Sequence, residues 1–417
     1  MNATLQSIFQ TAYSRYAQEH RLPLKHHQAA QAIMSCRTPS LGGHEQHCPD
    51  GHESHIQYHS CRHRSCPKCN ALPKAQWVQK QFQKLLATDH YHVIFTLPHE
   101  LLPLWRYNQR WMAHTLFQVV HETMTTLAKD PKHLGGLPGM ILSLHTWGRN
   151  LSLHPHIHCL ITGGGMTTDG AWKNVKHNYL FPARVVQALY RGKMRSALWQ
   201  GLRNGELKLP GTTGPAEQGL CLKELAKKTW NVRIQPPYQH GRGVMKYLAR
   251  YIKGGPISNH RIRDADASTV TFAYRDHRDG QHKVQRLNTT HFISRVLDHV
   301  VEPRQHVIRH YGLYGHQAQE KRNLCRACLG QAPEQERQTM TWAEYVTQRS
   351  PNQVGCCSEC GKPLVRGVTF GKNSLYRVPG SGFVQQDVRA NIETWPSDRE
   401  KPPDGSLYFF GASMSLN

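Results

Sequence analysis

The chain has 417 residues, a length that predicts two or three domains rather than one. Its 52 Lys and Arg outnumber its 28 Asp and Glu, and the formal net charge of +24 favours a polyanionic partner, nucleic acid before an anionic membrane surface. No stretch approaches the roughly 20 apolar residues of a membrane span, and the N-terminus lacks the apolar core of a signal peptide. We therefore expect a soluble, intracellular protein without a membrane partner.

Most of the 12 cysteines form two groups. Five lie between residues 36 and 69, and five lie between residues 325 and 360. In an intracellular chain, clustered cysteines with Cys-x-x-Cys spacing predict zinc sites rather than disulfides.

The sequence pattern of the N-terminal part predicts helices followed by a zinc site. Apolar residues recur at helical spacing over residues 1–35. The next segment, 36–69, combines a Cys-x-x-Cys knuckle with an upstream Cys-x-x-x-His pair, and together they offer four ligands for a tetrahedral ion. The candidate ligands are Cys48, His52, Cys66 and Cys69, with Cys36 and Cys61 either replacing His52 or helping to build a second site. Nearby Arg and Lys residues suggest a DNA-contacting module, and the alternative is a purely structural clip.

The middle of the chain alternates helices and strands. In chain order the pattern predicts a helix over 71–88, a strand over 91–97, a long helix over 104–129 and a strand over 140–147. A turn at 148–150 then leads into a stretch that reads His-Pro-His-Ile-His from residue 154. We therefore expect an antiparallel hairpin whose second strand carries three histidines.

The histidine strand predicts a metal site with an open side. Side chains alternate between the two faces of a strand, so His154, His156 and His158 share one face. Two imidazoles on one face can hold a metal ion from one side, as a catalytic site requires. Antiparallel pairing brings His145 close to His154, and either of these two can be the third ligand. The alternative is a histidine-rich strand with no ligand role.

A second decisive stretch is the helix predicted over 241–253, which Gly-Gly-Pro ends. Tyr247 and Tyr251 lie four residues apart and therefore on one face of this helix. The cations around them, which make the face a candidate phosphate site, are Lys246, Arg250 and Lys253. A cationic field also eases formation of a tyrosinate, whose ordinary pKa is about 10. The alternative is ordinary core packing of two tyrosines.

The C-terminal region carries two more Cys-x-x-Cys knuckles. Four thiolates in this pattern predict a zinc-ribbon-like site made by Cys325, Cys328, Cys357 and Cys360. Cys356 is a spare thiol that could substitute for Cys357. Beyond about residue 370 the chain is rich in Gly, Pro, Ser and Asp, which predicts a loosely ordered tail.

The histidine strand and the tyrosine helix together predict cleavage of a phosphodiester by a tyrosine. The metal ion would polarise the scissile phosphodiester, and a tyrosine hydroxyl would attack phosphorus in line. The products would be a tyrosyl-DNA phosphodiester and a free 3′-hydroxyl, so rejoining would need no ATP. A hard cation, Mg²⁺ or Mn²⁺, suits this chemistry, although imidazole ligands also accept softer metals.

Four stretches carry a resemblance to a known family. They are residues 60–69 with the Cys-Pro-Lys-Cys knuckle, 95–100 (Phe-Thr-Leu-Pro-His-Glu), 154–158 (His-Pro-His-Ile-His) and 247–252 (Tyr-Leu-Ala-Arg-Tyr-Ile). The chain resembles the HUH single-strand nucleases, and within them the two-tyrosine rolling-circle transposases of the insertion-sequence ninety-one family. One departure lies at the first zinc knuckle, where those relatives often have Cys-x-x-Cys-Gly and this chain has Cys48 followed by His52.

The resemblance implies an α+β fold. A central palm-like antiparallel sheet with packed helices, the HUH nuclease fold, would be flanked by N-terminal and C-terminal zinc-binding modules. The implied domains are a helical, zinc-binding, DNA-contacting domain over 1–88, a nuclease and strand-transfer domain over 89–312, a zinc-ribbon-like module over 313–370 and a loosely ordered tail over 371–417. One or two zinc ions would lie in the N-terminal module and one in the C-terminal module.

The resemblance also implies a function. Tyr247 and Tyr251 would be the nucleophiles of a transposase that cleaves and rejoins single-stranded DNA at transposon ends through 5′-phosphotyrosine intermediates, driving rolling-circle transposition. Its partners would be single-stranded DNA and transposon-end hairpins, and it would act as a monomer or dimer in the bacterial cytoplasm, associated with the nucleoid. The alternatives are a rolling-circle replication initiator or relaxase, which shares the chemistry, and a non-catalytic zinc-finger DNA-binding regulator.

Overall fold

The computed structural model describes residues 3–208, 228, 230–239, 255–276, 279–335, 339–348 and 355–372. The chain forms two compact units: Met1–Cys36 with Ser60–Tyr345, and Arg37–His59 with Val346–Asn417. The sequence predicts contiguous domains, whereas each unit combines two separate segments. None of the helices within the described ranges has both the length and the apolar character that a membrane crossing requires.

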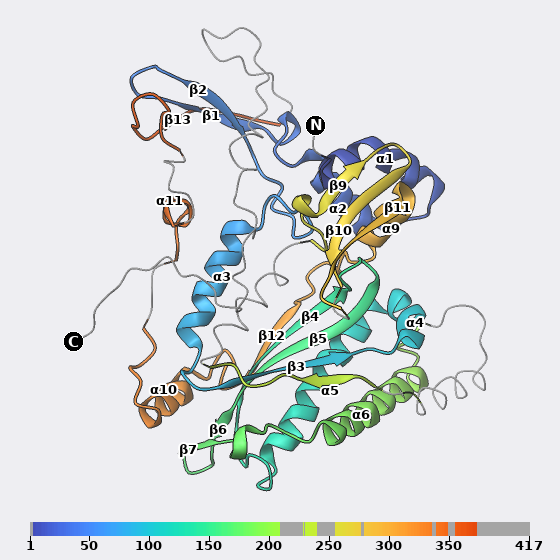
Figure 1. Ribbon diagram of the computed structural model, residues 1–417, viewed down its shortest axis with the longest axis vertical. Helices are drawn as coiled ribbons and strands as arrows, with labels where there is room; N and C mark the ends of the chain where they lie inside the picture. Colours follow the sequence, from blue (N-terminus) through green and yellow to red (C-terminus); the bar gives the residue numbers. More distant parts are fainter. Residues whose placement is uncertain are drawn as a thin grey trace. The chain divides into compact units, whose positions relative to one another are not determined.

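A five-stranded antiparallel sheet lies at the centre of the first unit (Figure 1). Its strands are β3 (His90–Thr96), β4 (Gly139–Trp147), β5 (Leu153–Thr162), β8 (Val232–Ile234) and β12 (Ile308–Gly312). They follow the order β12-β4-β5-β3-β8. The two longest strands, β4 and β5, form the predicted hairpin, and the amide of Gly148 closes its turn by donating to the carbonyl of Ser152 (2.8 Å). The antiparallel sheet with packed helices agrees with the predicted mixed α and β class.

The two faces of this sheet differ because side chains alternate along each strand. On one face, Val93, Leu142 and Ile157 are among the fully buried apolar side chains. They belong to the main hydrophobic core, which also includes residues of α5 (Gln109–Lys129) and α6 (Ala183–Arg203). Figure 1 shows both helices running beside the sheet. The helices anchor one face by apolar burial, and the opposite face carries histidines from β3, β4 and β5.

A second, three-stranded antiparallel sheet of order β11-β10-β9 also belongs to the first unit. Its strands and helices are β9 (Ile262–Ala265), β10 (Thr269–Arg275), β11 (His282–Asn288), α1 (Leu5–Glu19), α2 (Leu24–Ser35) and α9 (Thr289–Leu297). Phe9, Phe272 and Phe292 are fully buried in the core that these elements share. The α1 helix begins at a capping box, in which Oγ1 of Thr4 accepts a hydrogen bond from the amide of Ser7 (3.1 Å).

Shorter elements complete the first unit. They are α3 (Ala71–Lys84), η2 (His99–Leu101), α4 (Leu102–Tyr107), β6 (Gly164–Met166), β7 (Trp172–Asn174), η3 (Lys176–Asn178), η5 (Asn259–Arg261) and α10 (Gln319–Cys328), with α11 (Trp342–Thr347) at the sequence boundary to the second unit. The single helix predicted over 104–129 is divided at Asn108. The side chain of Asn108 bonds to both the amide and the carbonyl of Lys208 (each 2.6 Å), and α4 and α5 meet at this residue.

The second unit is built on a three-stranded antiparallel sheet of order β13-β1-β2. Its elements are η1 (Pro39–Leu41), β1 (Gly43–His47), β2 (Ser54–Tyr58) and β13 (Val365–Phe370). Gly43 of β1 is opposite Tyr58 on one side and Phe370 on the other. The middle strand therefore has one neighbour from its own hairpin and one from a distant part of the chain.

Candidate functional site

Strand pairing in the central sheet brings three histidines together. His156 and His158 share one face of β5 because they are two residues apart. On β4, His145 is directly opposite His156. One nitrogen atom of each of these three side chains lies within 4.8 Å of the others. Two adjacent strands therefore supply a cluster of the kind that the His-x-His spacing predicts.

The third member of this cluster is His145 and not His154. The β4–β5 ladder is irregular between His145 and Trp147, and this shift places His145 opposite His156. His154 lies one alternation further along the same face. Its carbonyl oxygen still contributes, because it accepts a hydrogen bond from Nδ1 of His156 (2.6 Å).

The nitrogen geometry of the cluster suits a divalent cation. Nε2 of His156 lies 3.0 Å from Nε2 of His158. Neighbouring ligands of an octahedral ion with bonds of about 2.1 Å lie about 3.0 Å apart. Because a carbonyl only accepts, Nδ1 of His156 carries the hydrogen in its bond to His154, and Nε2 keeps its lone pair for a metal.

Burial keeps these imidazoles neutral. His145, His156 and His158 are only 2%, 8% and 3% exposed. Removal from water disfavours the imidazolium form, which lowers the pKa of His156 to about 4 and holds the pKa values of His145 and His158 well below the ordinary value. Neutral imidazole is the form that binds metals, so the cluster is ready to bind at pH 7.

A fourth buried histidine, His92 of β3, supports the cluster and is not among the site residues predicted from the sequence. Its Nε2 lies 2.7 Å from Nδ1 of His158, and the two rings stack with centroids 4.9 Å apart. When His158 presents Nε2 to a metal, its Nδ1–H donates to His92. A signal was available, because His90 and His92 form a second His-x-His pair in the strand predicted over 91–97 and just before it.

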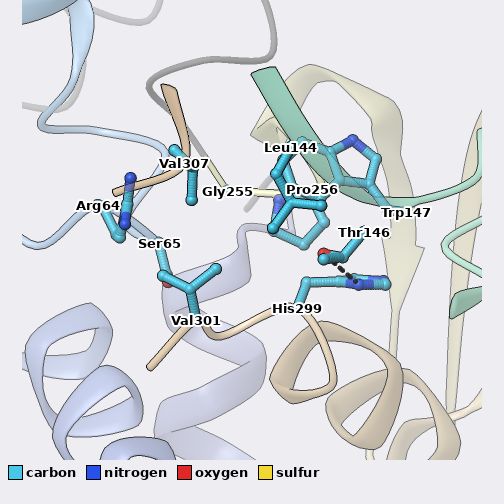
Figure 2. A pocket seen from close by; sticks show the side chains of 10 residues that line it. All are labelled: Arg64, Ser65, Leu144, Thr146, Trp147, Gly255, Pro256, His299, Val301 and Val307. Atoms are coloured by element: carbon cyan, nitrogen blue, oxygen red, sulfur yellow. Dashed lines mark hydrogen bonds between the residues drawn. The ribbon is translucent and has the colours of Figure 1, made fainter. Parts of the chain in front are cut away.

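A pocket is lined by residues at the end of β4 and by residues of other segments (Figure 2). Its lining includes Thr146, Trp147, Pro256 and His299. The Trp147 ring stacks on His145, with centroids 5.5 Å apart and planes inclined by 11°. Nδ1 of His299 accepts a hydrogen bond from the hydroxyl of Thr146 (3.2 Å), the dashed line in Figure 2. Trp147 therefore contacts the histidine cluster and also lines the pocket.

The predicted nucleophiles and phosphate contacts lie outside the described residues. They are Tyr247, Tyr251, Lys246, Arg250 and Lys253. The first described residue after them is Gly255, which lies in the pocket of Figure 2. A side-chain carbon at Gly255 would lie 2.6 Å from the carbonyl oxygen of Ser65, so only glycine allows this close approach.

Four cysteines of the first unit form a four-sulfur cluster. Its members are Cys36, Cys61, Cys66 and Cys69. From Sγ of Cys69, the other three sulfur atoms lie at 3.1, 3.5 and 3.7 Å. Ligand sulfurs around tetrahedral zinc, with bonds of about 2.3 Å, are about 3.8 Å apart. Contacts with the three neighbouring sulfurs hold the pKa of Cys69 far below its ordinary value, which favours the thiolate form that zinc binds.

This cluster corrects the predicted N-terminal ligand set. The knuckle that ends at Cys69 is completed by Cys36, directly after α2, and by Cys61. Cys48 and His52 lie instead in the turn between β1 and β2, in the second unit. Spacing along the chain allows the knuckle to be completed either by Cys48 and His52 or by Cys36 and Cys61. The second set is the one observed because the end of α2 places Cys36 beside the knuckle.

The structure also divides the predicted C-terminal zinc ribbon. Among the described residues, a second cluster that contains cysteines consists of Cys48, His52, Cys357 and Cys360. Cys325 and Cys328 lie on α10, where Cys325 is buried among apolar side chains and Cys328 is exposed. Burial raises the pKa of Cys325 to about 11, which favours its neutral thiol. Within the described ranges, neither of these two joins a metal-ligand cluster.

Two protein families match the chain. The family described as "Putative transposase" matches residues 139–322, which contain β4, β5 and the histidine cluster. The family described as "Transposase zinc-binding domain" matches residues 8–97, which contain the four-sulfur cluster. The chain is therefore a transposase with a zinc-binding domain.

Two curated relatives identify the kind of transposase. "Putative transposase y4qJ" of Sinorhizobium fredii is 34% identical over 366 residues, which are 84% of this chain and 92% of the relative. The transposase for insertion sequence element IS801 of Pseudomonas savastanoi pv. phaseolicola is 30% identical over 290 residues, 67% of this chain and 68% of the relative. The chain belongs to the insertion-sequence ninety-one family of transposases, as its resemblance implied.

Part of the chain is also similar to solved structures of the conjugative relaxase TrwC. The metal-free complex of TrwC with oriT DNA is 13% identical with a TM-score of 0.22, over 38% of this chain and 70% of that one. The metal-bound complex is 12% identical with a TM-score of 0.22, over 39% and 71%.

Proposed function

We propose that this transposase cleaves and rejoins single-stranded DNA at transposon ends by the tyrosine chemistry of an HUH nuclease, driving rolling-circle transposition. The observation that carries the proposal is the buried cluster of His145, His156 and His158 on paired strands, in a chain of a transposase family. Three imidazoles occupy only part of an octahedral shell, so phosphate oxygens and water can complete it. A structural zinc site, by contrast, is closed by four protein ligands.

In this proposal the three histidines hold Mg²⁺ or Mn²⁺. When bound, the cation supplies Lewis-acid polarisation of the scissile phosphodiester. The protein contributes orientation. The carbonyl of His154 fixes the ring of His156, and His92 fixes the ring of His158.

The nucleophile in this proposal is the hydroxyl of Tyr247 or Tyr251. Its oxygen bonds to phosphorus, the bond from phosphorus to the 3′-oxygen breaks, and the hydroxyl proton ends on the released 3′-hydroxyl. The DNA is then held as a 5′-phosphotyrosine. Attack by a 3′-hydroxyl reverses these bond changes and rejoins DNA without ATP. Two tyrosines allow one to hold the cleaved donor strand while the other cleaves the next junction.

Gly255 is the first described residue after the two tyrosines in the sequence. Gly255 lines the same pocket as Trp147, whose ring stacks on His145.

Charge supports single-stranded DNA and transposon-end hairpins as the partners. The formal net charge of +24 favours a polyanion. In the proposal Lys246, Arg250 and Lys253 contact backbone phosphates near the tyrosines. Zinc in the N-terminal domain would hold the DNA-contacting module in shape.

The test is covalent trapping with the full-length protein. Single-stranded DNA that carries the element's end is incubated with protein and Mn²⁺, and the adduct is resolved on a denaturing gel. We expect Tyr247→Phe and Tyr251→Phe to remove the adduct. Tyr179→Phe is the control, because this tyrosine is 58% exposed and outside the proposed site, and it should keep the adduct.

Two results would contradict the proposal. One is an adduct that persists in the Tyr247→Phe/Tyr251→Phe double variant. The other is cleavage that EDTA does not affect. A non-catalytic DNA-binding regulator would form no adduct even as the wild type, and a replication initiator or relaxase would cleave plasmid-origin DNA in preference to transposon ends.

A further inference from the structure

We propose that Cys48, His52, Cys357 and Cys360 hold one zinc ion that fastens the C-terminal segment to the N-terminal hairpin. This inference concerns the second unit and does not depend on the nuclease chemistry. The match to the zinc-binding transposase domain ends at residue 97, so it contains only half of this ligand set. The other half comes from a part of the chain to which neither matching family extends.

The two halves of the site are turns of the same construction. The amide of Cys48 donates to a carbonyl five residues later (2.8 Å), and the amide of Cys357 does the same (2.8 Å). The carbonyl of each cysteine accepts a hydrogen bond from a glycine amide, of Gly51 (3.0 Å) and Gly361 (2.9 Å). Both glycines have positive φ angles, 78° and 72°, which lets each turn fold back on its cysteine. Each half is thus a knuckle built to present its ligands from one side.

The ligand atoms of the two turns meet at the spacing of a tetrahedral zinc shell. Sγ of Cys48 lies 3.5 Å from Sγ of Cys360. Nδ1 of His52 lies 3.5 Å from Sγ of Cys48 and 3.8 Å from Sγ of Cys357. With Zn–S bonds of about 2.3 Å and Zn–N bonds of about 2.0 Å, tetrahedral edges are about 3.5–3.8 Å. Three sulfurs and one imidazole favour zinc and leave no open position, which indicates a structural ion.

Polar contacts outside the ligand set join the same two turns. The carboxylate of Glu53 accepts hydrogen bonds from the amide (2.7 Å) and the hydroxyl (3.2 Å) of Ser358. Nζ of Lys362 lies 2.7 Å from a carboxylate oxygen of Asp50. These contacts fix the turns in the orientation that brings their ligands together.

Apolar burial in this unit is small. In the part of it that the structure describes, the buried apolar side chains besides Cys48 and Cys357 are Val346 and Phe370. Three short strands without a substantial core have little stability of their own, and small modules of this kind depend on a metal or a disulfide. The zinc ion would therefore supply much of what holds β13 to β1.

The first test counts zinc ions per chain in dialysed full-length protein. If the four residues hold one ion, Cys48→Ser and Cys360→Ser each lose one equivalent relative to the wild type, and the double variant also loses one. The matched control is Cys325→Ser/Cys328→Ser, which removes the other C-terminal knuckle and should keep the wild-type zinc content. A double variant that loses two equivalents, or a control that loses one, would overturn the proposal.

The second test follows amide hydrogen exchange and ligand replacement. In Cys360→Ser, exchange should rise in both β1 and β13, while exchange in β3 stays at the wild-type rate and shows that the first unit is folded. His52→Cys should keep the zinc equivalent, because four thiolates also close a zinc shell, whereas His52→Ala should lose it. Unchanged exchange in β1, or equal zinc content in His52→Ala and the wild type, would contradict the fastening role.

Discussion

His92→Phe isolates the contribution of one hydrogen bond to metal binding. The phenyl ring can keep the stacking on His158, now at a centroid distance of 4.9 Å, but it has no nitrogen to replace the 2.7 Å contact with Nδ1. Without metal, His158 can carry its hydrogen on Nε2 and donate to Nε2 of His156, 3.0 Å away. Binding a cation moves that hydrogen to Nδ1, where the variant lacks the imidazole nitrogen of His92 as an acceptor.

The expected loss of affinity follows from the loss of this acceptor. A buried N–H left without a partner costs about 1–3 kcal/mol. Since about 1.4 kcal/mol corresponds to a tenfold change in a binding constant, Mn²⁺ affinity should fall by about 5- to 150-fold. The penalty appears only in the bound state, so thermal stability of the metal-free protein should change much less than the affinity.

Isothermal titration of full-length protein with Mn²⁺ measures this loss. The control is His90→Phe, which removes a buried histidine from the same strand. Nε2 of His90 contacts the hydroxyl of Tyr314 (2.6 Å) and not the cluster, so this variant should bind Mn²⁺ like the wild type. If His92→Phe bound Mn²⁺ within twofold of the wild type, the orienting role of His92 would be refuted.

Three further predictions concern stability. Burial lowers the pKa of His299 to about 4, so the unfolded chain takes up a proton first as the pH falls below about 6.5, and up to about 3 kcal/mol of stability is lost between pH 6.5 and 4. His299→Leu should remove this part of the pH dependence of the free energy of unfolding, measured by urea denaturation at a series of pH values. If the pH dependence were the same as in the wild type, His299 would not be its source. Arg322→Leu strands the carboxylate of Glu334, its partner at 2.8 Å, and should cost about 3–5 kcal/mol in chemical denaturation; a loss below about 1 kcal/mol would show that the pair is not effectively buried. Gly312→Ala should cost more than about 2 kcal/mol by the same assay, because φ is +57° and the new carbon would lie 1.9 Å from the carbonyl oxygen of Pro138; a neutral result would mean that this turn relaxes freely.

The histidine cluster could largely be predicted from the sequence because it rests on local rules. Alternation along a strand puts His156 and His158 on one face whatever surrounds them. The turn after Trp147 predicts the hairpin that brings β4 alongside. Local rules could not choose between His145 and His154, because the choice depends on a single irregularity in the β4–β5 ladder. The position of His92 beside the cluster could not be predicted by these rules, because it depends on the pairing of β5 with a third strand.

The cysteine ligand sets could not be predicted from local spacing alone. Each Cys-x-x-Cys knuckle is a local feature and was visible, but a knuckle does not specify its partner. Cys325 and Cys328 have the spacing of zinc ligands, yet they lie on α10 and one of them is buried among apolar side chains. Cys48 and Cys357 meet through β1–β13 pairing between distant segments. Such contacts follow from tertiary packing, which the spacing of cysteines does not encode.

The order of strands in the second unit determines when its sheet can be completed during synthesis on the ribosome. His47 of β1 pairs with Val365 of β13, more than 300 residues later. At translation rates of about 5–20 residues per second, the wait for that partner is about 15–60 s. Throughout this interval one edge of β1 presents unpaired amides and carbonyls, the kind of edge at which chains associate wrongly. A chain that terminates before the last strand would never pair this edge of β1. We therefore expect premature termination to cause aggregation before it causes a loss of activity.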